Sequence, residues 1–340
     1  MRANALRSVI AAAALLAAAL APAAAAPFRL IVTELDVPLV PNSVMPLAEK
    51  LGYFEREGVD VEIVRVQQTP SALAALKAGE GEMANVSVDA VLQLAARGDP
   101  GLKAVMSPNK SLPFLIAAKD SIARPAELAG RSFGIGRLGS LDHSLSAKVL
   151  AADGLAPDAV RFVALGQPAV RARALAAGQI DATTMSIGVW TDLPDKAGLH
   201  VLVDQDAYYA AAPVVNKVNV VAPAALESRR KDVEAVIAAL VKASRDFAAD
   251  PEKWVAAMAA ERPDVSRATL ETLAKSFAGS WSVNGGLARD ELAATEAWLY
   301  ETPDFAGLPE VPLAAWTEFG PLDAVLARLG TAPGRDRPVR

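Results

Sequence analysis

Hydrophobic and polar positions follow two different periods along the first two thirds of the chain. Residues Val59–Val66 read VDVEIVRV, and this alternation of apolar and charged side chains predicts a β-strand. Short apolar runs predict further strands at Phe28–Val32, Glu82–Val86, Lys103–Met106 and Phe114–Ala118. Helical spacing, with a glycine shortly after each last turn, predicts helices at Ala48–Arg56, Pro70–Ala78 and Ala90–Arg97. Strands separated by single helices predict βαβ units and mostly parallel sheets, which is the α/β class.

One segment is repeated at an offset of 99 residues. Residues 75–87 read ALKAGEGEMANVS, residues 174–186 read ALAAGQIDATTMS, and the two align without gaps. The repeat predicts two α/β lobes of similar topology, although any two βαβ units share part of such a pattern. The aligned pairs are Gly79 with Gly178, Glu82 with Asp181, Ser87 with Ser186 and, just before each helix, Gln68 with Gln167.

The last third of the chain has helical periodicity without further strands. Residues Val233–Ala248 place apolar side chains on one face and predict a long amphipathic helix. Shorter helices are predicted at Pro251–Ala260, Ser266–Phe277, Ala288–Tyr300 and Leu322–Leu329. We expect these helices to pack against one of the lobes. Residues 331–340 read TAPGRDRPVR, and without an apolar pattern they predict a loose tail.

Residues 1–26 predict an export signal. Two arginines precede an apolar run from Val9 to Leu20, and small residues that suit cleavage after Ala24 or Ala25 follow it. A membrane anchor or a buried helix is the alternative, but the run is too short to span a bilayer comfortably. Because the chain has no cysteine, it cannot be a lipoprotein. We therefore expect a soluble protein that is exported through this signal peptide.

Composition excludes several classes of function. The 34 Lys and Arg against 39 Asp and Glu give a net charge of −5, which argues against a nucleic-acid binder. The absence of cysteine rules out disulfides, thiolate metal sites and cysteine nucleophiles. Two histidines cannot build a multi-histidine metal site, so we expect no metal and no cofactor. Function is then expected from oxygen and amide groups, arginine and the backbone.

Four segments, in their order and spacing, resemble the periplasmic solute-binding proteins of ABC importers, in the nitrate/sulfonate/taurine-like branch. They read AEKLGYFEREGVDVEIVRV, SALAALKAGEGEMANVS, PAELAGRSFGIGRLGSLDHSLSAKVLAADGL and ALAAGQIDATTMS. The resemblance implies a two-lobed type II periplasmic-binding-protein fold, each lobe a mostly parallel sheet flanked by helices, with the ligand in a cleft between the lobes. It implies lobe I at residues 27–109 and 217–330, lobe II at 110–216, and crossing segments near Ser107–Phe114 and Pro213–Val220.

The same resemblance implies a monomer that captures a small organic solute by hinge closure and delivers it to a transmembrane permease and its ATPase. We expect an anionic solute with a sulfonate, nitrate-like or aromatic carboxylate group. Alternatives are a sensory binding protein of the same fold, a tripartite-transporter receptor and an enzyme of the pyrimidine-synthase-like branch. That enzyme branch relies on a Cys-rich motif, and a G-x-S-x-G elbow is also missing, so we expect no catalytic residues.

Candidate ligand-binding residues lie in loops that follow strands. In parallel α/β sheets, ligands bind beyond the carboxyl ends of strands, where helix N-termini favour anions. Some of the lobe I residues have a structural alternative: Asn42 or Ser43, and Thr69, as helix caps, and Asp89 as a capping or first-turn acid. If Asp89 faces the cleft, the ligand should carry a hydrogen-bond donor. The lobe I candidates are Asn42, Ser43, Gln68, Thr69, Ser87 and Asp89.

In lobe II, residues 134–143 read GIGRLGSLDH. The glycine spacing fits the dinucleotide fingerprint G-x-G-x-x-G, but that pattern alone is weak evidence, and no acidic residue suited to a ribose ends the next strand. The loop instead predicts a site for a small anion, with Ser140 as the helix cap and Arg137 supplying charge. Many relatives carry a Glu-Pro pair where this chain has Ile187–Gly188, so a cationic ligand is less expected. The candidates here and on the crossing segments are Asn109, Arg137, Ser140, His143, Gln167, Ser186, Trp190 and Asn216.

Overall fold

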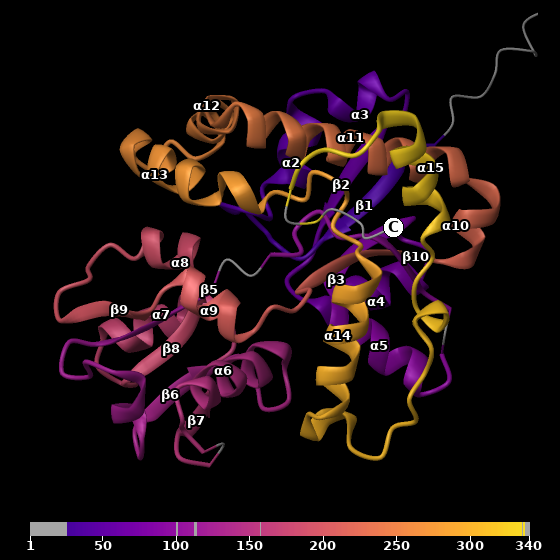
Figure 1. Cartoon of the computed structure of the whole chain (residues 1–340). Helices are drawn as coiled ribbons and strands as arrows, with labels where there is room; N and C mark the ends of the chain where they lie inside the picture. Colours follow the sequence, from indigo (N-terminus) through magenta and orange to yellow (C-terminus); the bar gives the residue numbers. More distant parts are fainter. Residues whose placement is uncertain (1–25, 100, 112–113, 157, 335, 337–340) are drawn as a thin grey trace, which may run out of the picture.

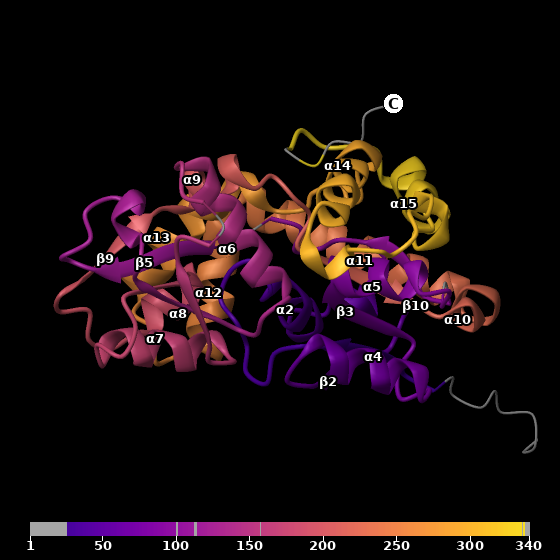
Figure 2. The ribbon, with the colours of Figure 1, turned by 90° about the horizontal axis from the view of Figure 1, so that it is seen from below.

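The computed structural model describes residues 26–99, 101–111, 114–156, 158–334 and 336, and the predicted signal peptide lies almost wholly outside them (Figure 1). The described chain forms two lobes, each built on one five-stranded sheet, and Figure 2 shows them next to each other from below. We call the part built on the first sheet lobe I and the part built on the second sheet lobe II. Within these ranges no helix has the length and apolar character that a membrane crossing requires.

The two sheets have the same topology, with strand orders β2-β1-β3-β10-β4 and β7-β6-β8-β5-β9. In each sheet four strands run one way and one strand runs against its two neighbours: β10 in lobe I and β5 in lobe II. The prediction of mostly parallel sheets is therefore confirmed. The strands of lobe I are β1 (Phe28–Val32), β2 (Val61–Arg65), β3 (Met83–Ser87), β4 (Lys103–Met106) and β10 (Lys217–Val221). Those of lobe II are β5 (Phe114–Lys119), β6 (Ser132–Ile135), β7 (Arg161–Ala164), β8 (Ala182–Ser186) and β9 (Leu199–Val203).

Each reversed strand is the first one that the chain forms after it passes from one lobe to the other. The chain passes between β4 and β5 and returns between α9 (Gln205–Ala211) and β10. The two passages lie side by side, because the N–H of Asn216 donates to the carbonyl of Lys110 at 3.1 Å. Ser107 adds a hydrogen bond from its hydroxyl to the carbonyl of Lys217, at 2.5 Å.

Helices flank both sheets (Figure 1). Lobe I begins with α2 (Val44–Lys50), α3 (Tyr53–Arg56), α4 (Thr69–Lys77) and α5 (Val88–Ala96). The other helices of lobe II are α6 (Leu141–Ala152), α7 (Pro168–Ala176) and α8 (Ile187–Asp192), with the short 3-10 helix η1 (Pro125–Leu128). The predicted single helix over Ala48–Arg56 is wrong: the chain breaks it at Gly52, whose φ of 70° is left-handed, and α2 and α3 result.

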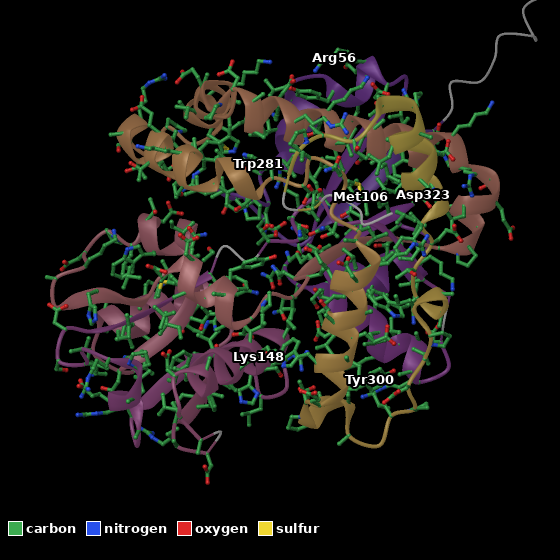
Figure 3. All side chains as sticks on the ribbon, in the orientation of Figure 1. Arg56, Met106, Lys148, Trp281, Tyr300 and Asp323 are labelled. Atoms are coloured by element: carbon green, nitrogen blue, oxygen red, sulfur yellow. The ribbon has the colours of Figure 1, made fainter. Side chains whose placement is uncertain are left out.

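The C-terminal third returns to lobe I, as the pattern predicts. The 20-residue α11 packs against α2, α3, α12 and α15 through a buried face. Trp281 lies within 6.4 Å of the rings of Phe247, Trp254 and Phe277, in a cluster beneath these helices (Figure 3). The elements are α10 (Pro223–Ser228), α11 (Arg230–Ala249), α12 (Pro251–Glu261), α13 (Arg267–Phe277), η2 (Ala278–Ser280), α14 (Arg289–Tyr300), η3 (Pro303–Phe305), η4 (Leu313–Ala315) and α15 (Gly320–Leu329).

The tail beyond α15 is anchored at Asp336. Its side chain is buried and accepts hydrogen bonds from the backbone N–H groups of Asn284 at 2.7 Å and Gly286 at 3.0 Å. The prediction of a loose tail over residues 331–340 is therefore wrong at this position, because a single polar side chain fixes it without any apolar pattern. The loop at residues 284–286 in turn packs on the first passage, since the N–H of Ser107 donates to the carbonyl of Gly285 at 2.7 Å.

The repeat read from the sequence is a structural repeat. Helices α4 and α7, and strands β3 and β8, begin and end at positions that differ by the predicted 99 residues. The paired acids play equivalent roles: Glu82 accepts from the N–H of Arg29 at 2.6 Å, and Asp181 from that of Ser132 at 3.0 Å. Each also has a cation, Arg29 or Lys119. Burial opposes ionisation of both acids, but these hydrogen bonds outweigh it and hold their pKa values below the ordinary range.

Replacing Asp181 by Asn is expected to lower the free energy of unfolding by about 2 kcal/mol at neutral pH. The pKa of Asp181 is depressed in the folded protein, so its carboxylate contributes stability above the ordinary value of 3.8 and loses it as the pH falls toward the folded pKa. Urea denaturation of wild type and variant near pH 7 and near pH 2.5 measures this, and the difference should shrink at the lower pH. The same change at the exposed Asp153 is the control. Equal losses at the two sites, or a loss independent of pH, would contradict the prediction.

Candidate ligand-binding site

A cavity of about 280 Å³ lies between the lobes and is lined by both. It is bounded by the residues that follow β1, β2, β6 and β7, by the last residues of β3 and β8, and by the first residues of the reversed strands β5 and β10. This is the place where the strand-end rule puts ligands. Its volume is at the low end of the range of small-molecule sites. Eight of the predicted residues line it: Gln68, Thr69, Ser87, Asp89, Arg137, Ser140, Gln167 and Asn216.

The polar side chains of Ser43, Asn42 and Asn109 are engaged inside lobe I, away from the cavity. Ser43 is fully buried, and its hydroxyl accepts from Nε1 of Trp254 at 2.9 Å. Asn109 donates to Asn42 at 2.6 Å and accepts from Asn85 at 3.0 Å. These contacts explain why the three residues do not line the cavity: their polar groups stabilise the interior of lobe I.

Three predicted residues of lobe II also lie outside the cavity lining. His143 packs edge-on against Phe162, and its Nδ1 accepts from the N–H of Gly139 at 3.2 Å. Ser186 caps α8 by accepting from the N–H of Val189 at 3.2 Å. Trp190 faces α13 of lobe I instead, on a separate shallow pocket, with Nζ of Lys196 5.5 Å from its ring centre. These three residues are close in sequence to strand ends that line the cavity, but their side chains do not face it.

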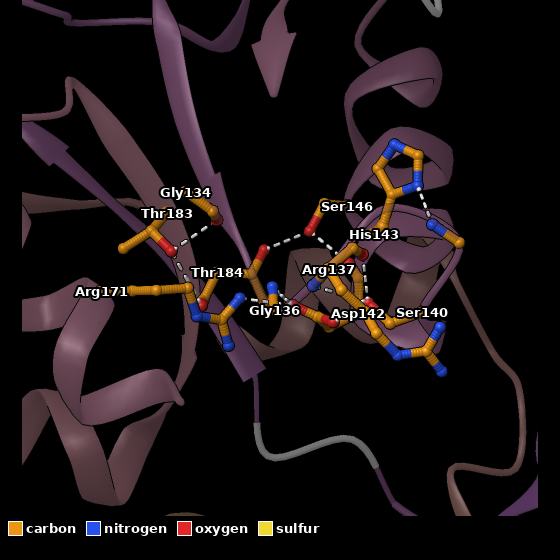
Figure 4. Close-up of polar contacts among 11 residues, drawn as sticks. Gly134, Gly136, Arg137, Ser140, Asp142, His143, Ser146, Arg171, Thr183 and Thr184 are labelled. Carbon is orange, nitrogen blue, oxygen red and sulfur yellow. Dashed lines mark hydrogen bonds and ion pairs between the residues drawn. The ribbon is translucent and has the colours of Figure 1, made fainter. Parts of the chain in front are cut away.

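Asp142 occupies the helix start that the sequence assigned to an external anion (Figure 4). One carboxylate oxygen accepts from the N–H of Gly136 at 2.8 Å, and the other accepts from the hydroxyl of Ser140. A Cβ on Gly136 would lie 2.9 Å from this carboxylate, so glycine is needed for the close approach. The chain's own carboxylate thus takes the N–H of Gly136 and places a negative charge in the first turn of α6, which makes this N-terminus less favourable for an external anion than the sequence predicts.

Arg171 is the second cavity residue that the sequence reasoning missed. Its side chain is 4% exposed and forms an ion pair with Asp142, which joins α7 to α6 (Figure 4). Its Nε has no hydrogen-bond partner among the described residues. The repeat carried a signal for it, because position 171 aligns with Ala72, which is fully buried in lobe I. A charged residue at the counterpart of a buried alanine indicates a buried charge with a function or a partner.

Four helices begin at the cavity, but only two leave their N-termini without an acid. Asp89 and Asp142 lie in the first turns of α5 and α6. The first turns of α4 and α7 contain no acidic residue, and each has a proline at its first or second position, Pro70 or Pro168. Gln68 and Gln167 are the N-caps of these two helices; both are exposed, line the cavity and make no side-chain cap. The repeat pair α4 and α7 therefore keeps the partial positive charge that attracts anions.

The predicted caps are partly corrected. Thr69 is the first helical residue of α4 rather than its cap, and its hydroxyl accepts from the N–H of Ser87 at 3.2 Å. Ser140 does hold the N-cap position of α6, but its hydroxyl accepts no hydrogen bond from the helix. It lies within hydrogen-bond distance of two acceptors, the carbonyl of Arg137 and Oδ1 of Asp142, which share its one proton. Both hydroxyls thus fix the loops that border the cavity.

Arg137 and Asp89 come from opposite lobes. Arg137 is exposed, and its guanidinium forms no hydrogen bond or ion pair with any residue that the structure describes. Burial raises the pKa of Asp89, whereas hydrogen bonds from Ser87 and Ala90 and the positive charge of Arg137 act in the other direction. The third cation of the cavity, Lys217, is paired with Glu34 at 2.7 Å. The remaining lining residues that were not predicted include Thr33, Gln67, Phe114, Thr184 and Met185.

Two matching five-stranded sheets with a cavity at their facing strand ends define a two-lobed binding fold of the type II periplasmic-binding-protein class. The family model described as NMT1/THI5 like matches residues 43–254, more than half of the chain, and the protein belongs to this family. The predicted resemblance is thereby confirmed for family and fold. No curated protein sequence matches the chain.

Solved structures of the same fold include both a periplasmic binding protein and an enzyme. A Bordetella bronchiseptica RB50 protein has a TM-score of 0.72 at 21% identity, covering 89% of this chain and 98% of its own. The periplasmic aliphatic sulphonate binding protein SsuA from Escherichia coli has 0.66 at 16%, covering 92% and 96%. The desulfurization enzyme DSZB has 0.61 at 16%, covering 89% and 99%. At these identities the likeness shows the fold.

Proposed function

We propose that this protein is the exported solute-binding component of an ABC importer, which captures a small organic anion between its lobes. The observation that carries the proposal is a cavity lined by both lobes. Its lining includes an exposed arginine, Arg137, that has no ion pair with a described residue, and the starts of two helices without acids in their first turns. Closure of the lobes around the solute would create the surface that a transmembrane permease and its ATPase recognise. We also propose the periplasm as its location, a monomeric state, and lobe boundaries at residues 109–110 and 216–217.

The charges at the end of the cavity near Arg137 favour an anionic group over a cation. Arg171 and Lys217 are each paired with an acid of the chain, so neither contributes much net positive charge to the cavity. Arg137 retains its charge, and the N-termini of α4 and α7 add theirs from both lobes. A sulfonate or carboxylate fits such donors, because its several oxygens accept from a planar guanidinium and from backbone N–H groups together. The sulphonate-binding relative of the same fold supports this class of solute.

Replacing Arg137 by Gln is expected to weaken binding of an anionic solute about tenfold or more, since a charge-assisted hydrogen bond is lost. Native mass spectrometry of the gently purified protein first identifies any retained solute. Thermal-shift titrations with alkanesulfonates, aromatic carboxylates and alkylamines then rank the classes. Arg131→Gln, a change of an exposed arginine outside the cavity, is the matched control. Binding of the amines without any binding of the anions would overturn the proposal.

A further inference from the structure

Asp89 is buried at the cavity without a partner for one of its oxygens. The residue is 6% exposed, lies in the first turn of α5 and lines the cavity. Ser87, Ala90 and the residue's own backbone N–H lie close enough to favour the charged form of the carboxylate. One carboxylate oxygen, Oδ1, is buried and makes no hydrogen bond among the described residues. A buried carboxylate oxygen in this state is costly, and native structures keep such groups chiefly where something else supplies the partner.

The other acid of the cavity shows that this state is specific to Asp89. Both oxygens of Asp142 are engaged, one by Gly136 and Arg171 and the other by Ser140. Asp142 therefore has its donors within the chain and is left with little capacity for a ligand. Asp89 has a cation only across the cleft, since the charge of Arg137 acts on it without an ion pair forming between them. The two opposite charges are thus held apart, one on each lobe.

We infer that Asp89 is a specificity-determining residue that selects solutes with a hydrogen-bond donor, such as an ammonium or amino group, at the end opposite their anionic group. The inference rests on the proposed function, in which Arg137 and the N-termini of α4 and α7 receive the anion. A solute with both groups supplies the missing partner of Asp89 on lobe I and a counter-ion for Arg137 on lobe II. Because each end then holds a different lobe, the same two contacts that select the solute also favour closure.

A solute of the same shape that carries a methyl group instead of the donor is rejected. Its binding would cover Asp89 with an apolar group and leave the buried oxygen without a hydrogen bond. Sites built to hydrogen-bond a polar group of the ligand reject analogues without that group strongly, because the buried polar group of the site is left unpaired. Two pairs of probe compounds isolate the contribution of the donor group to the binding affinity: 3-aminopropane-1-sulfonate with butane-1-sulfonate, and 4-aminobenzoate with 4-methylbenzoate. Within each pair the anionic group and the number of heavy atoms are the same.

Isothermal titration of the full-length secreted protein with these four compounds tests the inference. In wild type, the amino member of at least one pair is expected to bind about tenfold or more tightly than its methyl partner. In Asp89→Asn that preference should fall below about threefold, while the affinity for the methyl member changes little. The retained affinity for the methyl member shows that the variant is folded. Asp290→Asn, which alters an exposed first-turn acid of α14, should keep the wild-type preference.

The outcomes separate this inference from the proposed function. If amino and methyl members bind equally to wild type, or if Asp89→Asn keeps the preference, the inference is overturned and the anion site of the proposed function stands. If none of the four anions binds wild type while alkylamines do, the proposed function is overturned and the inference falls with it. A preference that depends on Asp89 supports both.

Discussion

Arg171→Met is expected to destabilise the protein by about 3–5 kcal/mol and to abolish solute binding. The substitution removes the buried cation that pairs with the half-buried Asp142 and leaves the charge of that acid without its partner, which is a costly change for a largely buried ion pair. Asp142 fixes the loop that carries Arg137, through the N–H of Gly136 and the hydroxyl of Ser140. The loss therefore spreads from stability to the geometry of the cavity.

Arg173→Met is the matched control for this change. It alters an arginine two residues along the same helix, where the side chain is exposed and forms no ion pair with a described residue. Urea denaturation gives the free energy of unfolding of both variants, and thermal-shift titration with an anion that binds wild type gives their affinity. A loss of less than about 1 kcal/mol in Arg171→Met would show that the pair with Asp142 contributes little. Arg171→Lys should recover part of the stability, because it restores the charge without the planar fork.

Gly286→Ala is expected to cost at least about 3 kcal/mol, because two independent effects add. The residue has a left-handed φ of 65°, which costs a non-glycine residue about 1 kcal/mol. A Cβ at this position would also lie 2.1 Å from the carbonyl oxygen of Ser107, on backbone that cannot move aside cheaply. The displaced segment is the first passage between the lobes, so the variant should also bind solute more weakly.

Gly307→Ala separates the two effects. Gly307 has a left-handed φ of 78°, but a Cβ there would meet no atom within 4 Å. This variant should therefore lose only about 1 kcal/mol and keep its affinity for solute. Chemical denaturation of the two variants beside wild type provides the comparison. Equal losses at both positions would mean that contact with Ser107 is relieved by a small shift and does not constrain the passage.

Local patterns were sufficient to predict most of the fold. Strands β1 and β4 lie at the predicted residues, since short apolar runs with polar ends leave little freedom in placement. The gapless repeat predicted two lobes of equal topology, and the structure has them. The break at Gly52 was missed because the apolar spacing continues through it, while one left-handed glycine ends the helix. The anchoring role of Asp336 was missed because a single tertiary contact produces no periodic pattern in the sequence.

The cavity was less predictable than the fold. The strand-end rule found the correct loops, but within a loop the side chain that faces the cavity depends on packing several ångströms away. The hydroxyl of Ser43 does not face the cavity, because it accepts a hydrogen bond from Trp254, more than 200 residues away in sequence. Asn42 and Asn109 do not line the cavity because they hydrogen-bond to each other within lobe I. Arg171 was not predicted, because its role depends on the ion pair with Asp142, which only the structure shows. Aligning the two halves of the repeat would have revealed Arg171, since it replaces a buried alanine.

The position of β10 fixes an order of assembly. This strand lies between β3 and β4, yet it is completed about 115 residues after β4 along the chain. A chain that emerges from its N-terminus at 5–20 residues per second therefore has, for on the order of ten seconds, a first sheet with a missing inner strand. All five strands of the second sheet lie between residues 114 and 203, so that lobe can be complete first. The lobe that starts the chain is thus the last whose five strands are all present, and its sheet closes only after the chain of the other lobe is complete.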